Sequence, residues 1–132
     1  MNNLLEVKFI SEKKGRGVFA KKYIAKGEVI DIAPIILISK KDWELIEPTI
    51  LSNYSFEWDD PKCKGEFDAA ISLSISQFIN HSYKPNVKYR YNYKSNSIEY
   101  ITIKSISKGE EILVNYNGSP LDKSPVWFEL AE

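Results

Sequence analysis

The 132-residue sequence contains one cysteine and one histidine, and it carries no net charge. Because Cys63 has no second cysteine to pair with, an internal disulfide is excluded. One cysteine and one histidine are also too few for a structural zinc cluster, so no metal site is expected. No apolar run approaches the ~18 residues of a membrane-spanning helix. The N-terminus lacks the basic and apolar regions of a secretory signal. We therefore expect no membrane association and a cytoplasmic location.

What the sequence does contain is typical of one globular domain. Apolar residues make up 43% and charged residues 27% of a chain long enough for a single core. The charge is unevenly placed, because residues 42–68 carry 8 acidic and 2 basic side chains whereas residues 1–41 carry 4 and 9. This balance argues against a dedicated nucleic-acid-binding protein. The acidic segment is either a solvated loop or a surface that attracts a basic peptide.

The hydrophobic pattern predicts a mainly β fold of short strands. Alternating or apolar stretches predict strands at residues 5–10, 18–20, 28–32, 35–38, 87–93, 97–103 and 111–116. Gly15, Arg16 and Gly17 are expected to break the first two strands apart. Residues 40–55 favour short helical turns, with Ser39 or Asp42 as the cap. Residues 24–30 and 106–112 are similar to one another and predict two similar corners, each with a glycine at positive φ.

Three features could carry chemistry, and each has a plain structural alternative. His81, beside Asn80, could be a general base, although a single histidine is more often structural. Gly15 and Gly17 would let the backbone approach a ligand closely, or would simply form a turn. Tyr116, at the end of the last strand, is either a core aromatic or a site residue. The tyrosine stripe of Tyr89, Tyr91 and Tyr93 is interpreted as sheet packing.

Taken together, these segments resemble the SET-domain protein lysine methyltransferases. The match comprises residues 14–20, residues 78–86 with the pattern Asn-His-x-x-x-Pro-Asn, and residues 109–116, in the family's order and spacing. It extends over about residues 7–116 and is closest to the minimal SET proteins of large DNA viruses and some bacteria. The Asn-His-x-x-x-Pro-Asn pattern is specific for the family, whereas Gly-x-Gly alone is not. The resemblance implies one SET domain over residues 1–132, with a core of about residues 5–117 and knot-like threading.

The resemblance also implies a cofactor, S-adenosyl-L-methionine, with S-adenosyl-L-homocysteine as the product. The residues for which the resemblance implies a role in cofactor binding are Lys14, Gly15, Arg16, Gly17, Phe78, Asn80, His81, Tyr116, Trp127 and Phe128. Lys14 to Gly17 would act through backbone groups, and the tail of residues 118–132 would close the site with Trp127 or Phe128. His81 thereby changes from a candidate base to a residue that supports the cofactor.

Tyr116 is the catalytic tyrosine that the resemblance implies, and Tyr54 is a second candidate that would line the lysine tunnel or pack beside it. The acidic residues Glu57, Asp59, Asp60, Glu66 and Asp68 would favour a target lysine with basic neighbours. One departure from the family is Gln77, where many SET enzymes have an arginine; the viral-type proteins lack that arginine too.

The predicted function is therefore S-adenosylmethionine-dependent methylation of a lysine in a basic protein or peptide, with histones as one class of substrate. The alternative is a SET fold that has lost catalysis and serves as an interaction module. The resemblance allows a homodimer, and it allows a location in a host cell or nucleus if the protein is delivered there. No direct nucleic-acid binding is expected.

Overall fold

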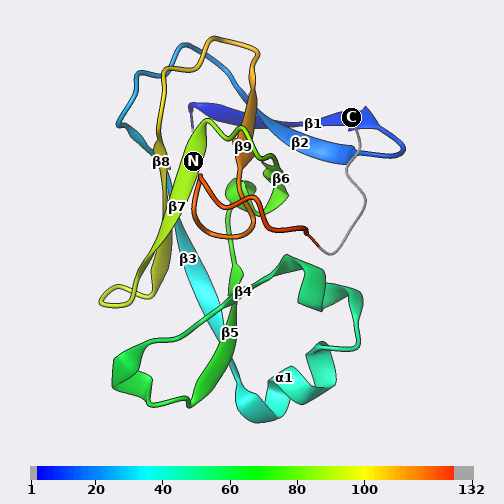
Figure 1. Cartoon of the computed structure of the whole chain (residues 1–132), viewed down its shortest axis with the longest axis vertical. Coiled ribbons are helices and arrows are strands. Elements are labelled where there is room, and N and C mark those ends of the chain that lie inside the picture. Colours follow the sequence, from blue (N-terminus) through cyan, green and yellow to red (C-terminus); the bar gives the residue numbers. More distant parts are fainter. Residues whose placement is uncertain (1–2, 127–132) are drawn as a thin grey trace.

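Nine strands form two sheets in the part of the chain that the structure, a computed structural model, describes, residues 3–126 (Figure 1). The four-stranded sheet has the order β1 (Leu5–Ser11), β2 (Gly15–Ala20), β9 (Glu111–Val114) and β6 (Asn80–His81). The five-stranded sheet has the order β4 (Ser55–Glu57), β5 (Phe67–Ser72), β3 (Val29–Ser39), β8 (Ser97–Thr102) and β7 (Val87–Asn92). One α-helix, α1 (Lys40–Ile46), and three 3-10 helices, η1 (Ile50–Tyr54), η2 (Pro61–Cys63) and η3 (Ile75–Phe78), complete the described elements. The prediction of a mainly β fold is confirmed, and knot-like threading stays a prediction.

Strand β3 is longer than the sequence predicts, because it continues through Pro34. Two separate strands around this proline were expected, and that expectation is wrong. β3 pairs with β8 from Val29 to Pro34 and with β5 from Ile35 to Ser39. Proline lacks an N–H and cannot donate a backbone hydrogen bond to a neighbouring strand. Because Pro34 lies where β3 changes partner, the sheet loses few hydrogen bonds there. As a result, β3 connects the upper and lower halves of the molecule in Figure 1.

The Gly-x-Gly segment is also placed differently from the prediction. Gly15, Arg16 and Gly17 were expected in a break between strands, but they form the first half of β2 and pair with β1. The turn lies just before them, and Gly15 ends it with a φ of 73°. This positive φ suits glycine, and the strand then continues with Gly17 facing a crowded neighbourhood.

The two similar corners predicted from residues 24–30 and 106–112 are confirmed. Ile24 and Ile106 form an isolated β-bridge with each other, and Gly27 and Gly109 have φ values of 87° and 88°. The helical prediction for residues 40–55 is confirmed by α1 and η1. Ser39 is the cap of α1, because its hydroxyl accepts the backbone N–H of Asp42 at 3.2 Å.

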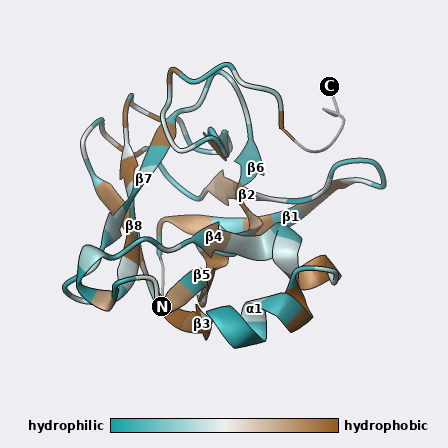
Figure 2. Cartoon of the chain, turned by 60° about the horizontal axis from the view of Figure 1, so that its bottom comes forward, coloured by the Kyte–Doolittle hydropathy of each residue, from teal (hydrophilic) through white to brown (hydrophobic). Residues whose placement is uncertain are grey.

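The core joins both sheets. Its fully buried large side chains are Tyr100, Ile24, Ile98, Ile106, Ile112, Val18 and Val87. Figure 2 shows the apolar residues concentrated on the strands and a hydrophilic face on α1. The order of the strands brings residues from both ends of the chain into one core. This shared core sets the position of the candidate site. Within residues 3–126, no helix has the length and apolar character needed to cross a membrane.

Candidate active site

A cleft of about 1300 Å³ is bounded by both sheets and by the α1–η1 segment. Its lining residues are Lys14, Gly15, Arg16, Trp43, Glu47, Ser52, Asn53, Tyr54, Ser55, Phe56, Glu57, Ser76, Gln77, Phe78, Ile79, Asn80, Tyr89, Arg90, Tyr91, Tyr100, Val114, Tyr116, Asn117 and Gly118. The three segments singled out in the sequence therefore meet in one cavity. Gly17 and His81, which were also predicted to bind the cofactor, do not line it.

The parallel pairing of β6 with β9 brings two distant segments together. Asn80 pairs with Leu113 and His81 with Val114. The buried Asn86 holds the same strand from the other side, because its Nδ2 donates to the Glu111 carbonyl at 2.8 Å and its Oδ1 accepts the Leu113 N–H at 2.9 Å. Asn86 is the last residue of the Asn-His-x-x-x-Pro-Asn pattern, which predicted no role for it. In the structure its side chain substitutes for a missing neighbouring strand.

Asn80 lies at the junction of β2, β6 and β9. Its Nδ2 donates to the Arg16 carbonyl at 2.9 Å and to Glu111 Oε2 at 2.8 Å. Glu111 also binds Lys14, with 2.8 Å between Oε1 and Nζ. The contact of Glu111 with Asn80 could not be predicted from the sequence, because only the register of β9 shows that this glutamate, unlike its neighbour Glu110, points at Asn80.

Arg16 lies over the Phe78 ring, with 4.4 Å from its guanidinium carbon to the ring centroid. Such cation–π contacts hold a charged group beside an apolar ring at the edge of a cavity. Both residues line the cleft. They provide a cationic group and a flat apolar surface next to Asn80.

His81 supports the backbone of Tyr116. The imidazole is buried, and its Nδ1 accepts the Tyr116 N–H at 2.9 Å. Burial lowers the pKa of His81, which favours the neutral ring that can accept this bond. The ring also packs against Tyr83 and Tyr116, at centroid distances of 4.6 and 5.3 Å. These contacts support the interpretation of His81 as a supporting residue.

Tyr116 presents a neutral hydroxyl at the wall of the cleft. It lies two residues beyond the end of β9, which is shorter than predicted, and its hydroxyl donates to the Ile79 carbonyl at 2.5 Å. Burial, with smaller contributions from Tyr54, Glu111 and Tyr89, raises the pKa of Tyr116 to about 12. The phenol therefore stays protonated at physiological pH and serves as a hydrogen-bond donor, not as a base.

Four further tyrosines line the cleft: Tyr54, Tyr89, Tyr91 and Tyr100. Tyr54, predicted as a second site residue, is 41% exposed there. Tyr89 was interpreted as sheet packing, but it lines the cleft as well, and its hydroxyl lies 3.4 Å from the Tyr116 carbonyl. Phe56 packs edge-on against Tyr89 with 5.3 Å between ring centroids. The period-two stripe gave no sign that Tyr89 turns toward Tyr116, because that depends on the position of β9.

The charges on the two sides of the cleft differ. Lys14 and Arg16 lie on the β2 side, and the exposed Glu47 and Glu57 lie on the α1 and β4 side. Arg90 of β7 also lines the cleft, and it is paired with Glu99, with 2.6 Å between Nε and Oε1. Within the described chain, neither Glu47 nor Glu57 takes part in an ion pair. Of the five acidic residues predicted to form a substrate wall, only Glu57 lines the cleft. Asp60 is buried and caps η2 by accepting the Lys62 N–H at 2.9 Å, so it does not belong to that wall.

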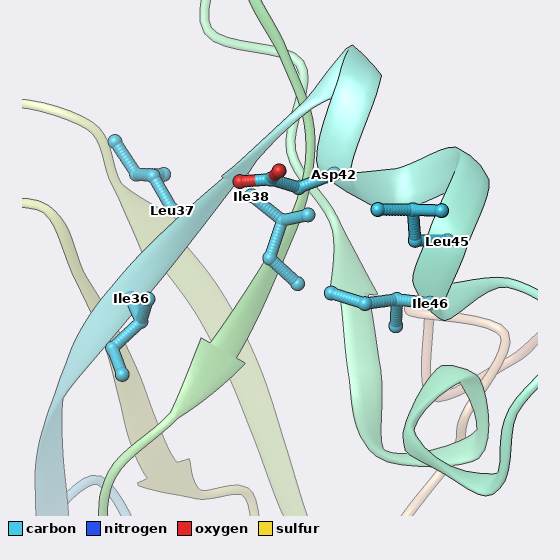
Figure 3. A pocket seen from close by; sticks show the side chains of 6 residues that line it. All are labelled: Ile36, Leu37, Ile38, Asp42, Leu45 and Ile46. Atoms are coloured by element: carbon cyan, nitrogen blue, oxygen red, sulfur yellow. The ribbon is translucent and has the colours of Figure 1, made fainter.

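A second, smaller cavity of about 290 Å³ lies between β3 and α1 (Figure 3). It is lined by Ile36, Leu37, Ile38, Asp42, Leu45 and Ile46. Its walls are apolar except for Asp42, so it offers no group of residues for acid–base or transfer chemistry. The larger cleft is therefore the candidate active site.

Gln77 lines the cleft, and its Nε2 donates to the Tyr54 carbonyl at 2.7 Å, which ties η3 to η1. Trp127 and Phe128 lie outside the described residues. In residues 3–126 no three of the metal-binding types, His, Cys, Asp or Glu, come close enough together to hold an ion.

Known proteins similar to this chain were found by sequence and by structure. The SET-domain family matches residues 15–117. A curated relative, the "Histone-lysine N-methyltransferase, H3 lysine-37 specific" of Schizosaccharomyces pombe, is 31% identical over 120 residues, covering 90% of this chain and 74% of the relative.

Two solved structures are also similar. A Plasmodium falciparum protein described as a candidate histone methyltransferase has a TM-score of 0.65 at 27% identity, covering 87% of this chain and 98% of its own. A humanized mutant of the Chaetomium thermophilum Polycomb Repressive Complex 2, bound to the inhibitor GSK126, has a TM-score of 0.67 at 25% identity, covering 86% of this chain and 14% of its own.

Proposed function

This chain belongs to the SET-domain family and is a protein-lysine methyltransferase, and we propose that it transfers a methyl group from S-adenosylmethionine to a lysine of a basic protein segment. The observation that carries the proposal is the meeting of the Gly-x-Gly strand, Asn80 and Tyr116 in one cleft. S-adenosylmethionine, when bound, supplies an electrophilic methyl group on a sulfonium, and S-adenosylhomocysteine is the product.

The β2 side of the cleft fits the cofactor. Both hydrogens of the Asn80 amide are donated to protein acceptors, so Oδ1 remains as an acceptor for an ammonium group. The Phe78 ring offers a flat surface for an aromatic base, and Arg16 a cation for a carboxylate. A Cβ on Gly17 would lie 2.7 Å from Glu111 Oε2, so a side chain there would disturb this wall. The proposed closure of the site by Trp127 or Phe128 remains a prediction.

The other side of the cleft fits the target lysine. Free lysine has a pKa of about 10.4, so deprotonating it near pH 7 costs about 4 to 5 kcal/mol. Aromatic walls such as Tyr54, Phe56 and Tyr89 disfavour the ammonium form by desolvation, and a nearby sulfonium repels it. Tyr116 and the backbone carbonyl of Ile79 would then align the neutral amine without a strong base.

The substrate that best suits the cleft is a basic segment. Glu47 and Glu57 lie on its exposed side and can pair with lysine or arginine next to the target. Histones have this composition, and the relative from Schizosaccharomyces pombe is named for a histone lysine. Histone methylation, and with it a nuclear site of action, is therefore part of the proposal.

The alternative, an inactive SET-fold interaction module, is not favoured, because Asn80, His81 and Tyr116 are present together in connected geometry. Calorimetry with S-adenosylhomocysteine separates the two. We expect 1:1 binding, followed by transfer of labelled methyl groups to histones. Absence of both binding and transfer in a folded protein would reject the proposal.

A further inference from the structure

One carboxylate, that of Glu111, joins the two segments that form the cofactor side of the cleft. Its Oε1 pairs with Lys14 Nζ at 2.8 Å, and its Oε2 accepts from Asn80 Nδ2 at 2.8 Å. The side chains of Lys14 and Glu111 are 28% and 15% exposed, so the pair is partly shielded from water. Shielding strengthens such a pair relative to one on the open surface.

Gly17 makes room for this arrangement. A Cβ at this position would lie 2.7 Å from Glu111 Oε2 and 3.0 Å from Asn80 Nδ2. The contact between Glu111 and Asn80 therefore occupies the space that the side chain of any other residue type at position 17 would fill.

The network determines which way the Asn80 amide points. In the observed orientation its two N–H bonds meet two acceptors, the Arg16 carbonyl and the Glu111 carboxylate. In the reversed orientation Oδ1 would face both acceptors, and three oxygens would repel one another. The observed orientation leaves Oδ1 without a hydrogen bond to any residue from 3 to 126, and the atom is available to a donor from the cleft.

We propose that Glu111, held in place by Lys14, is a positioning residue that locks the Asn80 amide with its oxygen toward the ammonium group of the cofactor. This inference rests on the proposed function. Glu111 itself does not touch the ligand; its effect passes through Asn80. Without the carboxylate, the amide can rotate and present N–H groups to a cation, which weakens binding.

The first test is Glu111→Gln, which keeps the size of the side chain but offers one oxygen to two donors. We expect affinity for S-adenosylhomocysteine to fall about tenfold, the effect of losing one charge-assisted hydrogen bond. Affinity for methylthioadenosine, which lacks the amino acid part, should not change. Calorimetry measures both without requiring activity. Lys14→Met, which leaves Glu111 less restrained, should show a smaller loss with the same selectivity.

The matched control is Glu110→Gln. It makes the same change of charge one residue earlier, on an exposed side chain whose carboxylate accepts the Ser107 N–H, which glutamine can also accept. This variant should bind both ligands like the wild type.

The second test exchanges donor and acceptor. Asn80→Asp places two carboxylates side by side, and the double variant N80D/E111Q restores one donor and one acceptor. Glu111→Gln should therefore weaken S-adenosylhomocysteine binding in the wild type and strengthen it in the N80D background. A purely structural role for Glu111 predicts no such change of sign.

The inference is overturned if Glu111→Gln weakens both ligands equally or neither, or if N80D/E111Q binds no better than N80D. Binding of S-adenosylhomocysteine and methyl transfer by the wild type are read in the same experiments. If the wild type binds and transfers, and the Glu111 variants bind both ligands as it does, only the role of Glu111 is rejected. If the wild type neither binds nor transfers, the proposed function is rejected as well.

Discussion

The Tyr116 side chain presents its hydroxyl at the cleft wall, where it donates to the Ile79 carbonyl. Its backbone N–H donates to His81 Nδ1. We expect Tyr116→Phe to lower turnover about 100-fold, the usual effect of removing one aligned donor at a reacting centre. Cofactor affinity should stay the same, because Asn80 and Arg16 are unaffected. Steady-state kinetics and calorimetry measure the two quantities.

Tyr83→Phe is the control for that variant. Tyr83 also packs on His81, but its hydroxyl donates to the Ser124 carbonyl and it does not line the cleft. Its loss should leave turnover unchanged. Equal turnover of Tyr116→Phe and wild type would refute the role of the hydroxyl.

The tyrosines also predict how stability depends on pH. Burial raises the pKa of Tyr116 to about 12 and raises those of Tyr89, Tyr91 and Tyr100 above the ordinary value of 10.0. The folded protein thus binds these phenolic protons more tightly than the unfolded protein does. Their contribution to stability is complete below pH 10 and is lost as pH rises toward the folded pKa values. Urea unfolding from pH 8 to 11.5 should show this decrease, and Tyr116→Phe should make it shallower.

At the scale of elements, the short strand β9 depends on Asn86. This side chain makes two hydrogen bonds to the backbone of β9 and is buried. Asn86→Ala leaves the partly buried N–H of Leu113 and C=O of Glu111 without this partner and should reduce the free energy of unfolding by about 2 to 4 kcal/mol. The exposed Asn53, which makes no side-chain hydrogen bond within the described residues, provides the control. Equal urea midpoints for the two alanine variants would contradict this role.

The Gly-x-Gly half of β2 offers a second comparison of variants. In Gly17→Ala the new Cβ meets Ile10 and Glu111 side-chain atoms at 2.6 and 2.7 Å, so we expect cofactor binding to weaken. In Gly15→Ala the Cβ meets nothing within 4 Å, and the strain of a φ of 73° should cost about 1 kcal/mol of stability instead. Calorimetry and thermal unfolding separate the two effects. Wild-type affinity in Gly17→Ala would show that the wall tolerates a side chain.

How far the sequence predicts these elements depends on the range of the interactions. The β7–β8 hairpin and the two glycine corners follow from local patterns and are confirmed. The continuity of β3 through Pro34 could not be predicted, because it depends on β5 and β8 pairing with different halves of the strand. The resemblance located Asn80 and Tyr116, but the orientations of Glu111 and Tyr89 follow from the register and position of β9, which local patterns do not reveal.

At the scale of the molecule, the unequal charges of the cleft predict a preference for basic substrates. Replacing Glu47 and Glu57 together by glutamine should raise KM for a peptide with arginine or lysine beside the target, with little effect on kcat. The preference should also weaken as salt is added, because both glutamates are exposed. Competition between peptides with basic and acidic flanks measures it. Equal use of both peptides by the wild type at low salt would contradict the prediction; Glu66→Gln and Asp68→Gln, at positions that do not line the cleft, are the controls.

The whole chain gives the most direct test of the central claim, which is that the cleft methylates a lysine of a protein with S-adenosylmethionine. Wild-type protein and Tyr116→Phe are incubated with histones and with a cell lysate in the presence of cofactor carrying a deuterated methyl group, and the products are sequenced by mass spectrometry. We predict labelled methyl-lysine in basic segments with the wild type and a strongly reduced yield with Tyr116→Phe. Folded wild-type protein that binds the cofactor but labels no lysine, or labels equally with Tyr116→Phe, would contradict the account.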